Sequence, residues 1–341
     1  MSTTRNVLTL DEFRFSEMRN FPHATGELSN LLRDIGLAAK GINLEVNRAG
    51  LVDILGETEL VNVQGEKVKK LDLIANAHLM GVLKRGISCA GVVSEEEDDF
   101  IVFDDVMSRN SKYIVAFDPL DGSSNIENCI SIGTIFGIYL RSSPAGEICS
   151  EEDFVLQGSK MVAAGYVIYG SSTMFVFATT RGVNGFTLDP SIGEFYLSHP
   201  SIRCPEEGSI VSVSFSNVFH YPEGVRKFLE HCQLVNKENE NQFSQRNVGS
   251  MVADLHRNLI QGGIFLNPST TNYKDGKLRL AYECSPWAFI FERAGGRAID
   301  GKQRILDEPF KNIHQRAPLY IGSNKLISEL EVFLKEHNSP E

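Results

Sequence analysis

Two aspartates three positions apart, Asp118 and Asp121, are the residues whose types and spacing most directly suggest chemistry. The apolar run 114–117 before them is typical of a short buried strand, and the Asp-Pro dipeptide then begins a turn. We therefore expect the strand to end by placing both carboxylates in one small volume. Because two carboxylates that close repel each other unless a cation lies between them, and hard divalent ions prefer oxygen ligands, the pair predicts a metal site.

Small residues follow the second aspartate directly, at Gly122, Ser123 and Ser124. Their backbone N–H groups can line up at the start of the next element and bind an anion. A cation on one side and a phosphate on the other is the arrangement of a metal-dependent phosphatase. The alternative interpretation is an ordinary surface turn, because Asp-Pro and Asp-Gly are common turn dipeptides.

Further acidic residues follow other predicted strands. Glu95 and Glu96 come directly after the apolar segment 89–93, and acids at two strand ends on one sheet edge would form a site of three or four carboxylates. The rest of that acidic run, residues 97–99, is interpreted as a solvated loop. Glu283 also stands at a predicted strand end before a helix, where the alternative is an acid that stabilises the helix N-terminus.

Glu66 and Asp72 flank a lysine-rich segment just before a predicted helix. Taken alone they are typical of a charged loop. If they lie close to Glu95, they become further ligands, or a base that orients the attacking water.

The composition excludes several classes of protein. The chain has 341 residues, 42% of them hydrophobic, and a formal net charge of -11 without a basic stretch, so we expect no nucleic-acid partner. The charge-free segment 161–180 is interpreted as two buried strands joined by a turn, and no membrane association is expected. The six cysteines are scattered, and the N-terminus lacks an apolar signal core, so we expect a cytoplasmic protein with unpaired thiols.

The periodicity of apolar residues predicts a mixed α/β fold in layers with two lobes. Long helices are expected over 27–48, with Thr25 as a plausible N-cap, and over 71–85. The segment 199–205 is the expected boundary, beyond which strands and helices alternate. The predicted strands are 89–93, 101–103, 113–117, 131–140, 162–168, 174–179, 185–188, 194–197, 210–215, 263–266 and 278–282, and the further helices are 224–232, 250–261 and 286–294.

Blocks of sequence from about residue 9 to about residue 333 resemble the class I fructose-1,6-bisphosphatases, in the expected order. The DPLDGSS element is also similar to the wider superfamily of lithium-sensitive, magnesium-dependent sugar and inositol phosphatases. The resemblance implies an α-β-α-β-α sandwich with an N-terminal domain, 1–200, and a C-terminal domain, 201–341. The matching blocks are 65–72 (GEKVKKLD), 93–96 (VSEE), 117–125 (FDPLDGSSN), 133–139 (GTIFGIY), 163–170 (AAGYVIYG), 248–256 (VGSMVADLH), 262–266 (GGIFL), 276–284 (GKLRLAYEC) and 313–318 (IHQRAP).

The same resemblance implies hydrolysis of the 1-phosphate of fructose 1,6-bisphosphate by in-line attack of water, with two to three Mg²⁺ ions, or Mn²⁺ or Zn²⁺ instead. Asp72 and Glu96 fall on the pair that polarises the water, and Glu66 takes a place where the family commonly has Asp. The 1-phosphate would lie against Asp121, Gly122, Ser123 and Ser124, with Arg279 nearby and Lys277 on the sugar. The implied metal ligands are Glu95, Asp118, the Leu120 carbonyl, Asp121 and Glu283.

The distal end of the implied substrate site departs from the family. Three tyrosines that help to hold the 6-phosphate in the family are replaced here by Asn217, Asn247 and Asn267, whereas Arg246, which in the family reaches across a subunit interface, is present. Asparagine still donates hydrogen bonds but lacks the ring's packing surface. We therefore keep a second interpretation, a phosphatase for another sugar bisphosphate such as sedoheptulose 1,7-bisphosphate.

The resemblance also implies a homotetramer and an AMP site. AMP would lie at the start of the first long helix and against a nearby strand, although a plain helix cap is an equal alternative there. The third functional interpretation is a catalytically weak phosphatase-like protein that binds a metabolite and acts through assembly. The implied AMP residues are Thr25, Gly26, Glu27, Leu28, Ser29, Lys112 and Tyr113.

Overall fold

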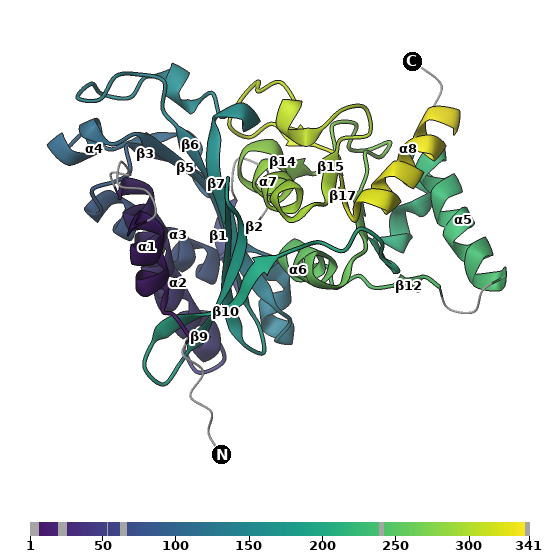
Figure 1. The fold of residues 1–341 in the computed structure, drawn as a ribbon, viewed down its shortest axis with the longest axis horizontal. Coiled ribbons are helices and arrows are strands. Elements are labelled where there is room, and N and C mark those ends of the chain that lie inside the picture. The colour runs from purple at the N-terminus through teal and green to yellow at the C-terminus, as the bar shows by residue number, and fades with distance from the viewer. Residues whose placement is uncertain (1–6, 20–25, 53, 62–66, 239–241, 338–341) are drawn as a thin grey trace.

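The computed structural model of the chain describes residues 7–19, 26–52, 54–61, 67–238 and 242–337. These residues form five layers, in which an eight-stranded and a five-stranded sheet alternate with three layers of helices (Figure 1). The expected α-β-α-β-α sandwich is therefore confirmed. The chain changes from the first sheet to the second between Ile202 and Ile210.

The larger sheet carries the predicted aspartate pair. Its strand order is β10-β9-β8-β7-β6-β5-β3-β4, and the neighbours β3 and β5 run parallel, whereas the other pairs are antiparallel. Strand β5 is buried along nearly its whole length. The strands are β3 (Gly91–Ser94), β4 (Ile101–Val102), β5 (Tyr113–Asp121), β6 (Ile132–Leu140), β7 (Met161–Tyr169), β8 (Thr173–Thr179), β9 (Gly182–Asp189) and β10 (Glu194–Ile202).

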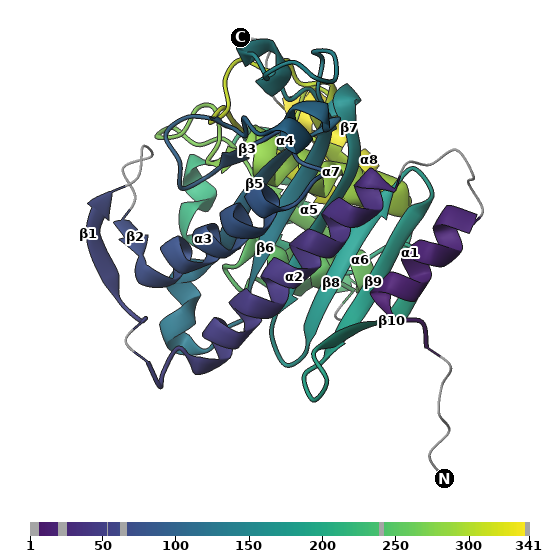
Figure 2. The same cartoon turned by 90° about the vertical axis from the view of Figure 1, so that its left-hand side faces the viewer.

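Helices α1 (Leu10–Arg19), α2 (Glu27–Arg48) and α3 (Lys70–Arg85) cover the outer face of this sheet (Figure 2). Helix α2 forms where the spacing predicted it, because its apolar residues recur on one face and are buried against the sheet. Its N-cap is Gly26, in the left-handed conformation at φ 78°, instead of Thr25, which lies outside the described residues.

The second sheet has the order β12-β11-β13-β17-β15. Helices α6 (Met251–Gln261) and α7 (Ser285–Ala294) lie between the two sheets, and α5 (Glu223–Glu238) and α8 (Asn324–His337) cover the far side (Figure 1). Helix α7 is buried along most of its length, and its Trp287 stacks on Tyr166 of β7 with ring centroids 4.4 Å apart. The strands are β11 (Ile210–Val213), β12 (Ser244–Gln245), β13 (Ile264–Asn267), β15 (Arg297–Ile299) and β17 (Leu319–Gly322).

Several predicted boundaries are wrong, and two matter for the site. Strand β5 does not end at residue 117 but continues through Asp121, and the predicted strand 278–282 stops at Arg279 and becomes the π-helical turn η5 (Leu280–Cys284). Strand β10 runs to Ile202, into the expected boundary segment. The division at residues 200 and 201 stays a prediction. The periodicity also gave no sign of α1, α4 (Val106–Asn110), α8, β1 (Glu57–Val61), β2 (Lys67–Lys69), β12, β15, β16 (Arg316–Ala317) and β17.

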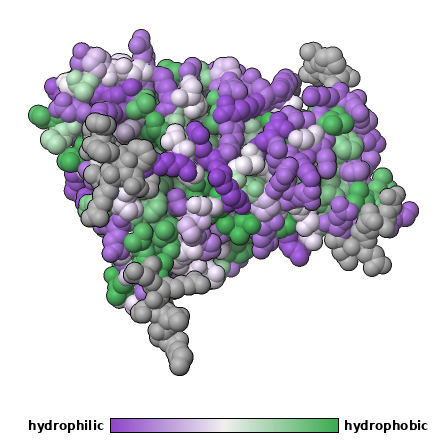
Figure 3. Space-filling model, in the orientation of Figure 1, coloured by the Kyte–Doolittle hydropathy of each residue, from purple (hydrophilic) through white to green (hydrophobic). Residues whose placement is uncertain are grey.

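The charge-free segment 161–180 is the antiparallel hairpin β7–β8, as predicted. Among the described residues, no helix combines the length and the apolar character that crossing a bilayer requires. The face in Figure 3 is mostly hydrophilic, with apolar residues in smaller groups. All six cysteines are free thiols, and only Cys129 is exposed.

Candidate active site

The parallel pairing of β3 with β5 brings the two predicted groups of acids together. Ser94 pairs with Phe117, and the N–H of Glu95 donates to the Phe117 carbonyl at 3.2 Å. Since parallel strands end at the same sheet edge, Glu95 leaves β3 directly beside Asp118 on β5. The predicted convergence of these strand ends is confirmed.

A bulge in β5 allows Asp118 and Asp121 to face one site. In a regular strand residues three apart point to opposite faces, but the pairing with β6 runs from Asp118–Ile135 to Asp121–Gly133 and so contains one extra residue. Pro119 suits the bulge because it has no N–H to donate, and its carbonyl accepts a hydrogen bond from Thr134 Oγ1 at 2.9 Å.

The structure brings a third acid, Glu283, to this pair from the other end of the chain. Single carboxylate oxygens of Asp118, Asp121 and Glu283 all lie within 4.8 Å of one another. Glu283 is positioned by the π-helical turn η5, in which the backbone N–H of Arg279 donates to Glu283 Oε2 at 2.6 Å. This position favours the functional interpretation of Glu283, and its role as a metal ligand stays a prediction.

Arg279 is the cation inside the acidic cluster. Its Nη2 lies 2.7 Å from Glu95 Oε1, and its Nη1 lies 3.8 Å from Glu283 Oε2. Both Arg279 and Glu283 are buried. Arg279 therefore neutralises part of the negative charge, and its place beside the 1-phosphate stays a prediction.

Burial and the remaining negative charges raise the pKa values of the acidic cluster. Burial, together with the charges of Glu95, Asp121 and Glu283, raises the pKa of Asp118 well above its ordinary value. Burial raises the pKa of Asp121 to about 6, against the stabilising hydrogen bonds from the Val252 N–H and the Ser250 hydroxyl. Burial raises the pKa of Glu283 to about 8, although Arg279 opposes the shift. The cluster is thus short of positive charge.

The donor set fits a hard divalent cation. Three carboxylates surround one small volume, and the group contains neither His nor Cys. Oxygen-only ligands suit Mg²⁺ or Mn²⁺, whereas Zn²⁺ commonly takes nitrogen or sulfur as well. Glu95 lies beside this group and pairs with Arg279, and Leu120 lies within the bulge between Asp118 and Asp121. The roles of Glu95 and of the Leu120 carbonyl as metal ligands stay predictions.

The small residues after Asp121 form a tight turn beside the cluster. Gly122 has φ 78°, and the short 3₁₀ helix η1 (Ser123–Asn128) starts directly after it. A Cβ at Gly122 would lie 2.9 Å from Ser250 Cβ and Oγ, so only glycine fits. The partly exposed Ser123 and exposed Ser124 therefore lie next to the carboxylates.

Two of the three predicted water-activating acids belong to the described residues, and Glu66 lies outside them. Burial raises the pKa of Asp72 to about 6, with a further contribution from the charge of Glu95, although the Lys69 N–H stabilises its carboxylate. Glu96 follows Glu95, and its N–H donates to Ser94 Oγ at 3.3 Å.

The prediction of a solvated loop over 97–99 is wrong for Glu97. Asp98 and Asp99 are exposed, but Glu97 is partly buried and accepts a hydrogen bond from Asn76 Nδ2 at 2.7 Å. Asn76 also accepts one from Ser94 Oγ at 2.8 Å, so it ties this loop to α3.

The three asparagines at the distal end line one cavity of about 290 Å³. Asn217 comes from the 3₁₀ helix η4 (Phe215–His220), Asn247 from the segment before α6, and Asn267 from the end of β13. Asp121 and Lys277 also line this cavity, so it reaches the acidic cluster. Arg246 is exposed, with its Nη1 on the Gln245 carbonyl at 3.2 Å.

Thr25 lies outside the described residues, and the other residues implied for AMP lie at the start of α2 and around the beginning of β5. Lys112 Nζ donates to Glu27 Oε1 at 2.9 Å, which joins the helix to the beginning of β5. Leu28 and Ser29, in the first turn of α2, and Tyr113 are partly buried. This contact is a helix-end ion pair, and AMP binding stays a prediction.

Residues that hold Asp121 were missed at the sequence level. Ser250 Oγ and the N–H of Val252 donate to Asp121 Oδ2 at 3.1 and 2.9 Å. Both lie about 130 positions away along the chain, and nothing in their residue types identifies Asp121 as their partner.

A layered α/β sandwich with buried carboxylates beside a glycine–serine turn, next to a polar cavity, defines a metal-dependent sugar phosphatase. Two family models match the chain: "Fructose-1-6-bisphosphatase, N-terminal domain" over residues 8–200, and "Fructose-1-6-bisphosphatase, C-terminal domain" over residues 204–335. The chain belongs to the fructose-1,6-bisphosphatase family of phosphoric monoester hydrolases, enzymes that hydrolyse fructose 1,6-bisphosphate.

Solved structures agree with this assignment. The holo form of fructose-1,6-bisphosphatase from Leishmania major matches with a TM-score of 0.90 and 36% identity, over 97% of this chain and 100% of that one. Its apo form matches with a TM-score of 0.85 and 36% identity, over 96% and 99% of the two chains. Its T-state form matches with a TM-score of 0.84 and 37% identity, over the same shares.

Proposed function

We propose that this chain hydrolyses the 1-phosphate of fructose 1,6-bisphosphate with Mg²⁺ at the cluster of Asp118, Asp121 and Glu283. The observation that carries the proposal is the 4.8 Å convergence of these acids beside the Gly122 turn. Burial and, after it, the charges of neighbouring acids raise the pKa values of all three, and bound divalent cations would favour their ionised forms. The same convergence speaks against a merely phosphatase-like binding protein.

The chain's own residues divide the chemical work. Asp72, with its pKa near 6, is suited to accept a proton from the attacking water at neutral pH, and Glu96 is its proposed partner. The N–H groups of Gly122, Ser123 and Ser124 bind the phosphoryl oxygens, and Lys277 orients the sugar. Two or three bound Mg²⁺ ions would supply charge neutralisation for the phosphoryl group and lower the pKa of water. Glu66 is a further proposed acid near this water.

The proposal is tested by phosphate release from fructose 1,6-bisphosphate with Mg²⁺, and again after chelation or with excess Li⁺. We expect activity only with Mg²⁺, and we expect Asp118→Asn to abolish it. The matched control is Asp189→Asn, because Asp189 also ends a strand of the same sheet but its side chain accepts hydrogen bonds from Ser191 in its own turn. Equal activity of wild type and Asp118→Asn would refute the assignment.

A second candidate substrate is sedoheptulose 1,7-bisphosphate. It is favoured by the shared cavity of Asn217, Asn247 and Asn267, which offers amide groups where the family has aromatic rings. Both substrates should be compared by kcat/KM in wild type and in Asn247→Tyr and Asn267→Tyr. If restoring the rings leaves the ratio of the two kcat/KM values unchanged, the asparagines do not select the sugar.

Regulation, assembly and compartment belong to this proposal too. AMP would bind at Gly26 and Glu27 with Lys112 and Tyr113, where its phosphate would compete with the 2.9 Å Glu27–Lys112 pair. We propose that the protein is a homotetramer in which Arg246 contacts the substrate of the neighbouring subunit. We also propose that it acts in the cytoplasm. Activity that is insensitive to millimolar AMP would contradict the AMP site, and a monomer by light scattering would contradict the homotetramer.

A further inference from the structure

The segment 246–249 runs between the two ends of the substrate site. It carries Arg246 and Asn247, the latter on the wall of the distal cavity, and it leads into Ser250, which donates to the metal-site carboxylate Asp121. The Gly249 carbonyl also accepts a hydrogen bond from Asn125 Nδ2, in the helix after the phosphate turn, at 3.1 Å. The segment therefore contributes Asn247 to the distal cavity, and its last residue, Gly249, contacts the helix after the phosphate turn.

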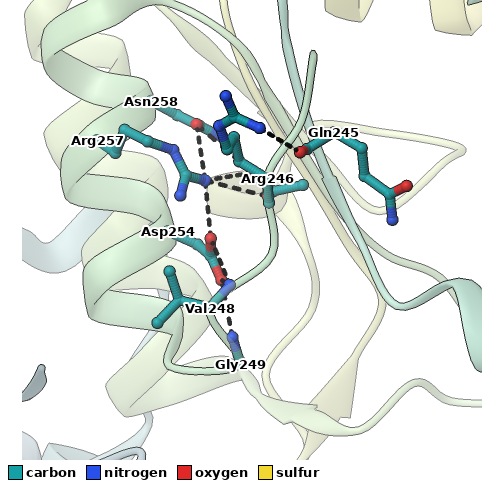
Figure 4. Close-up of polar contacts among 8 residues, drawn as sticks. Gln245, Arg246, Val248, Gly249, Asp254, Arg257 and Asn258 are labelled. Carbon is teal, nitrogen blue, oxygen red and sulfur yellow. Dashed lines mark hydrogen bonds and ion pairs between the residues drawn. The ribbon is translucent and has the colours of Figure 1, made fainter. Parts of the chain in front are cut away.

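Asp254 on α6 holds the segment by its backbone (Figure 4). The N–H of Val248 lies 3.0 and 2.9 Å from the two oxygens of Asp254, and the N–H of Gly249 lies 3.1 Å from Oδ2. Asp254 is fully buried. A buried carboxylate with such backbone donors fixes a loop more firmly than a neutral acceptor does.

Arg257, one turn further along α6, completes the anchor. Its Nη2 lies 2.7 Å from Asp254 Oδ1, 3.2 Å from the Arg246 carbonyl and 2.7 Å from Ser212 Oγ on β11, with Asn258 Oδ1 at 3.4 Å (Figure 4). The backbone N–H of Arg246 donates to the Val211 carbonyl at 3.0 Å. Arg246 is thereby tied on both sides, to β11 and to α6.

We propose that Asp254, held by Arg257, is a positioning residue for the distal phosphate: it fixes segment 246–249 so that Arg246 and Asn247 meet that phosphate in place. The inference rests on the proposed sugar bisphosphatase activity. Asp254 acts through the loop and not on the reacting atoms, so its loss raises KM for a bisphosphate more than it lowers kcat.

Asp254→Asn is a sharp test because no orientation of the amide serves every donor. If the amide NH₂ takes the place of Oδ2, it opposes the Gly249 N–H, which is also a donor. If it takes the place of Oδ1, it opposes the Arg257 guanidinium, again a donor. Loss of a hydrogen-bond partner that orients a metal ligand typically costs 10–100-fold, and by the same reasoning for a phosphate-binding loop we expect KM for fructose 1,6-bisphosphate to rise about tenfold. For fructose 1-phosphate, which lacks the distal phosphate, kcat/KM stays within about twofold of wild type.

Asp153→Asn is the matched control. Asp153 is equally buried and accepts backbone N–H bonds from Ser142 and Ser143, both at 2.7 Å, and from Ser150 at 2.9 Å. It anchors a loop beyond Leu140, the end of β6 opposite Gly133, which pairs with Asp121. This variant should lower thermal stability and leave both KM values unchanged.

Two further measurements keep the inference testable if Asp254→Asn folds poorly or turnover is absent. Arg257→Lys keeps the charge but cannot reach Asp254, Arg246 and Ser212 together, so we expect a KM increase smaller than that of Arg257→Met. Calorimetry with fructose 6-phosphate reads distal binding without catalysis, and we expect about tenfold weaker binding to the Asp254 variant.

The outcomes separate the two proposals. If wild type releases no phosphate from fructose 1,6-bisphosphate or fructose 1-phosphate, the proposed function is wrong. Calorimetry with fructose 6-phosphate then tests by itself whether Asp254 positions the distal site. If the Asp254 and Arg257 variants lose the same factor on mono- and bisphosphate, or bind fructose 6-phosphate as wild type does, Asp254 is merely structural and the inference is overturned.

Discussion

Replacement of Gly122 by alanine tests how the phosphate turn and the metal site are joined. Gly122 has φ +78°, a conformation that costs a non-glycine residue about 1–2 kcal/mol. The new Cβ would also lie 2.9 Å from Ser250 Cβ and Oγ. Gly193 supplies the comparison, since it has φ +68° and no atom within 4 Å of its Cβ position. Both substitutions carry the backbone cost, and only Gly122→Ala carries the contact.

We expect both variants to lose thermal stability, Gly122→Ala more than Gly193→Ala because of the added contact, and only Gly122→Ala to lose activity. Its contact displaces Ser250, whose hydroxyl donates to Asp121 Oδ2 at 3.1 Å. Loss of such a partner typically weakens metal binding 10–100-fold, so the Mg²⁺ concentration for half-maximal phosphate release should rise by about tenfold or more. The assay is a Mg²⁺ titration of phosphate release, with scanning fluorimetry for stability.

The contact itself is tested in a Ser250→Gly background. That change removes Cβ and Oγ and leaves Ser250 Cα 3.3 Å from the alanine Cβ. We therefore expect Gly122→Ala to reduce activity much less in Ser250→Gly than in wild type. The reasoning is refuted if Gly122→Ala costs the same factor in both backgrounds, or if Gly193→Ala loses as much activity.

Three further predictions concern charge. Asp118→Asn should unfold at a higher temperature than wild type when both are metal-free at pH 8, because burial and the charges of Glu95, Asp121 and Glu283 disfavour the ionised form of Asp118; a lower midpoint would contradict this. Mg²⁺ should stabilise wild type by about 2.7 kcal/mol at a hundredfold excess over Kd, which raises its unfolding temperature, and should leave the unfolding temperature of Asp118→Asn unchanged. An equal rise in both proteins would mean that the ions bind elsewhere. Burial lowers the pKa of His256 to about 4, where its Nδ1 lies 2.7 Å from the Tyr166 hydroxyl, so the unfolded chain binds the extra proton between pH 6.5 and 4 and stability falls as pH falls through that window. Wild type should therefore lose about 2 kcal/mol more than His256→Gln between pH 7.5 and pH 5 in urea unfolding, and parallel losses would exclude His256 as the cause.

Much of the fold could be predicted because the signals are local. The apolar period of α2 and the Gly86 that ends α3 give helices with the predicted C-terminal boundaries. The hairpin β7–β8 was also predictable, since two apolar runs flank a turn. The elements that were missed, β15, β16 and β17 among them, are short and owe their stability to neighbouring strands instead of their own periodicity.

Residue types alone determined which side chains could bind a metal and a phosphate: the paired aspartates, the acids after β3 and the Gly-Ser-Ser turn. Only the tertiary structure decided which of these acids meet, because Asp118 and Asp121 share a site through a bulge and Glu283 joins them through a π-helical turn. It likewise decided that Glu97 bonds to Asn76 and that Asp254 holds the segment 246–249. These relations join residues brought together by packing, and a local pattern carries no information about such partners.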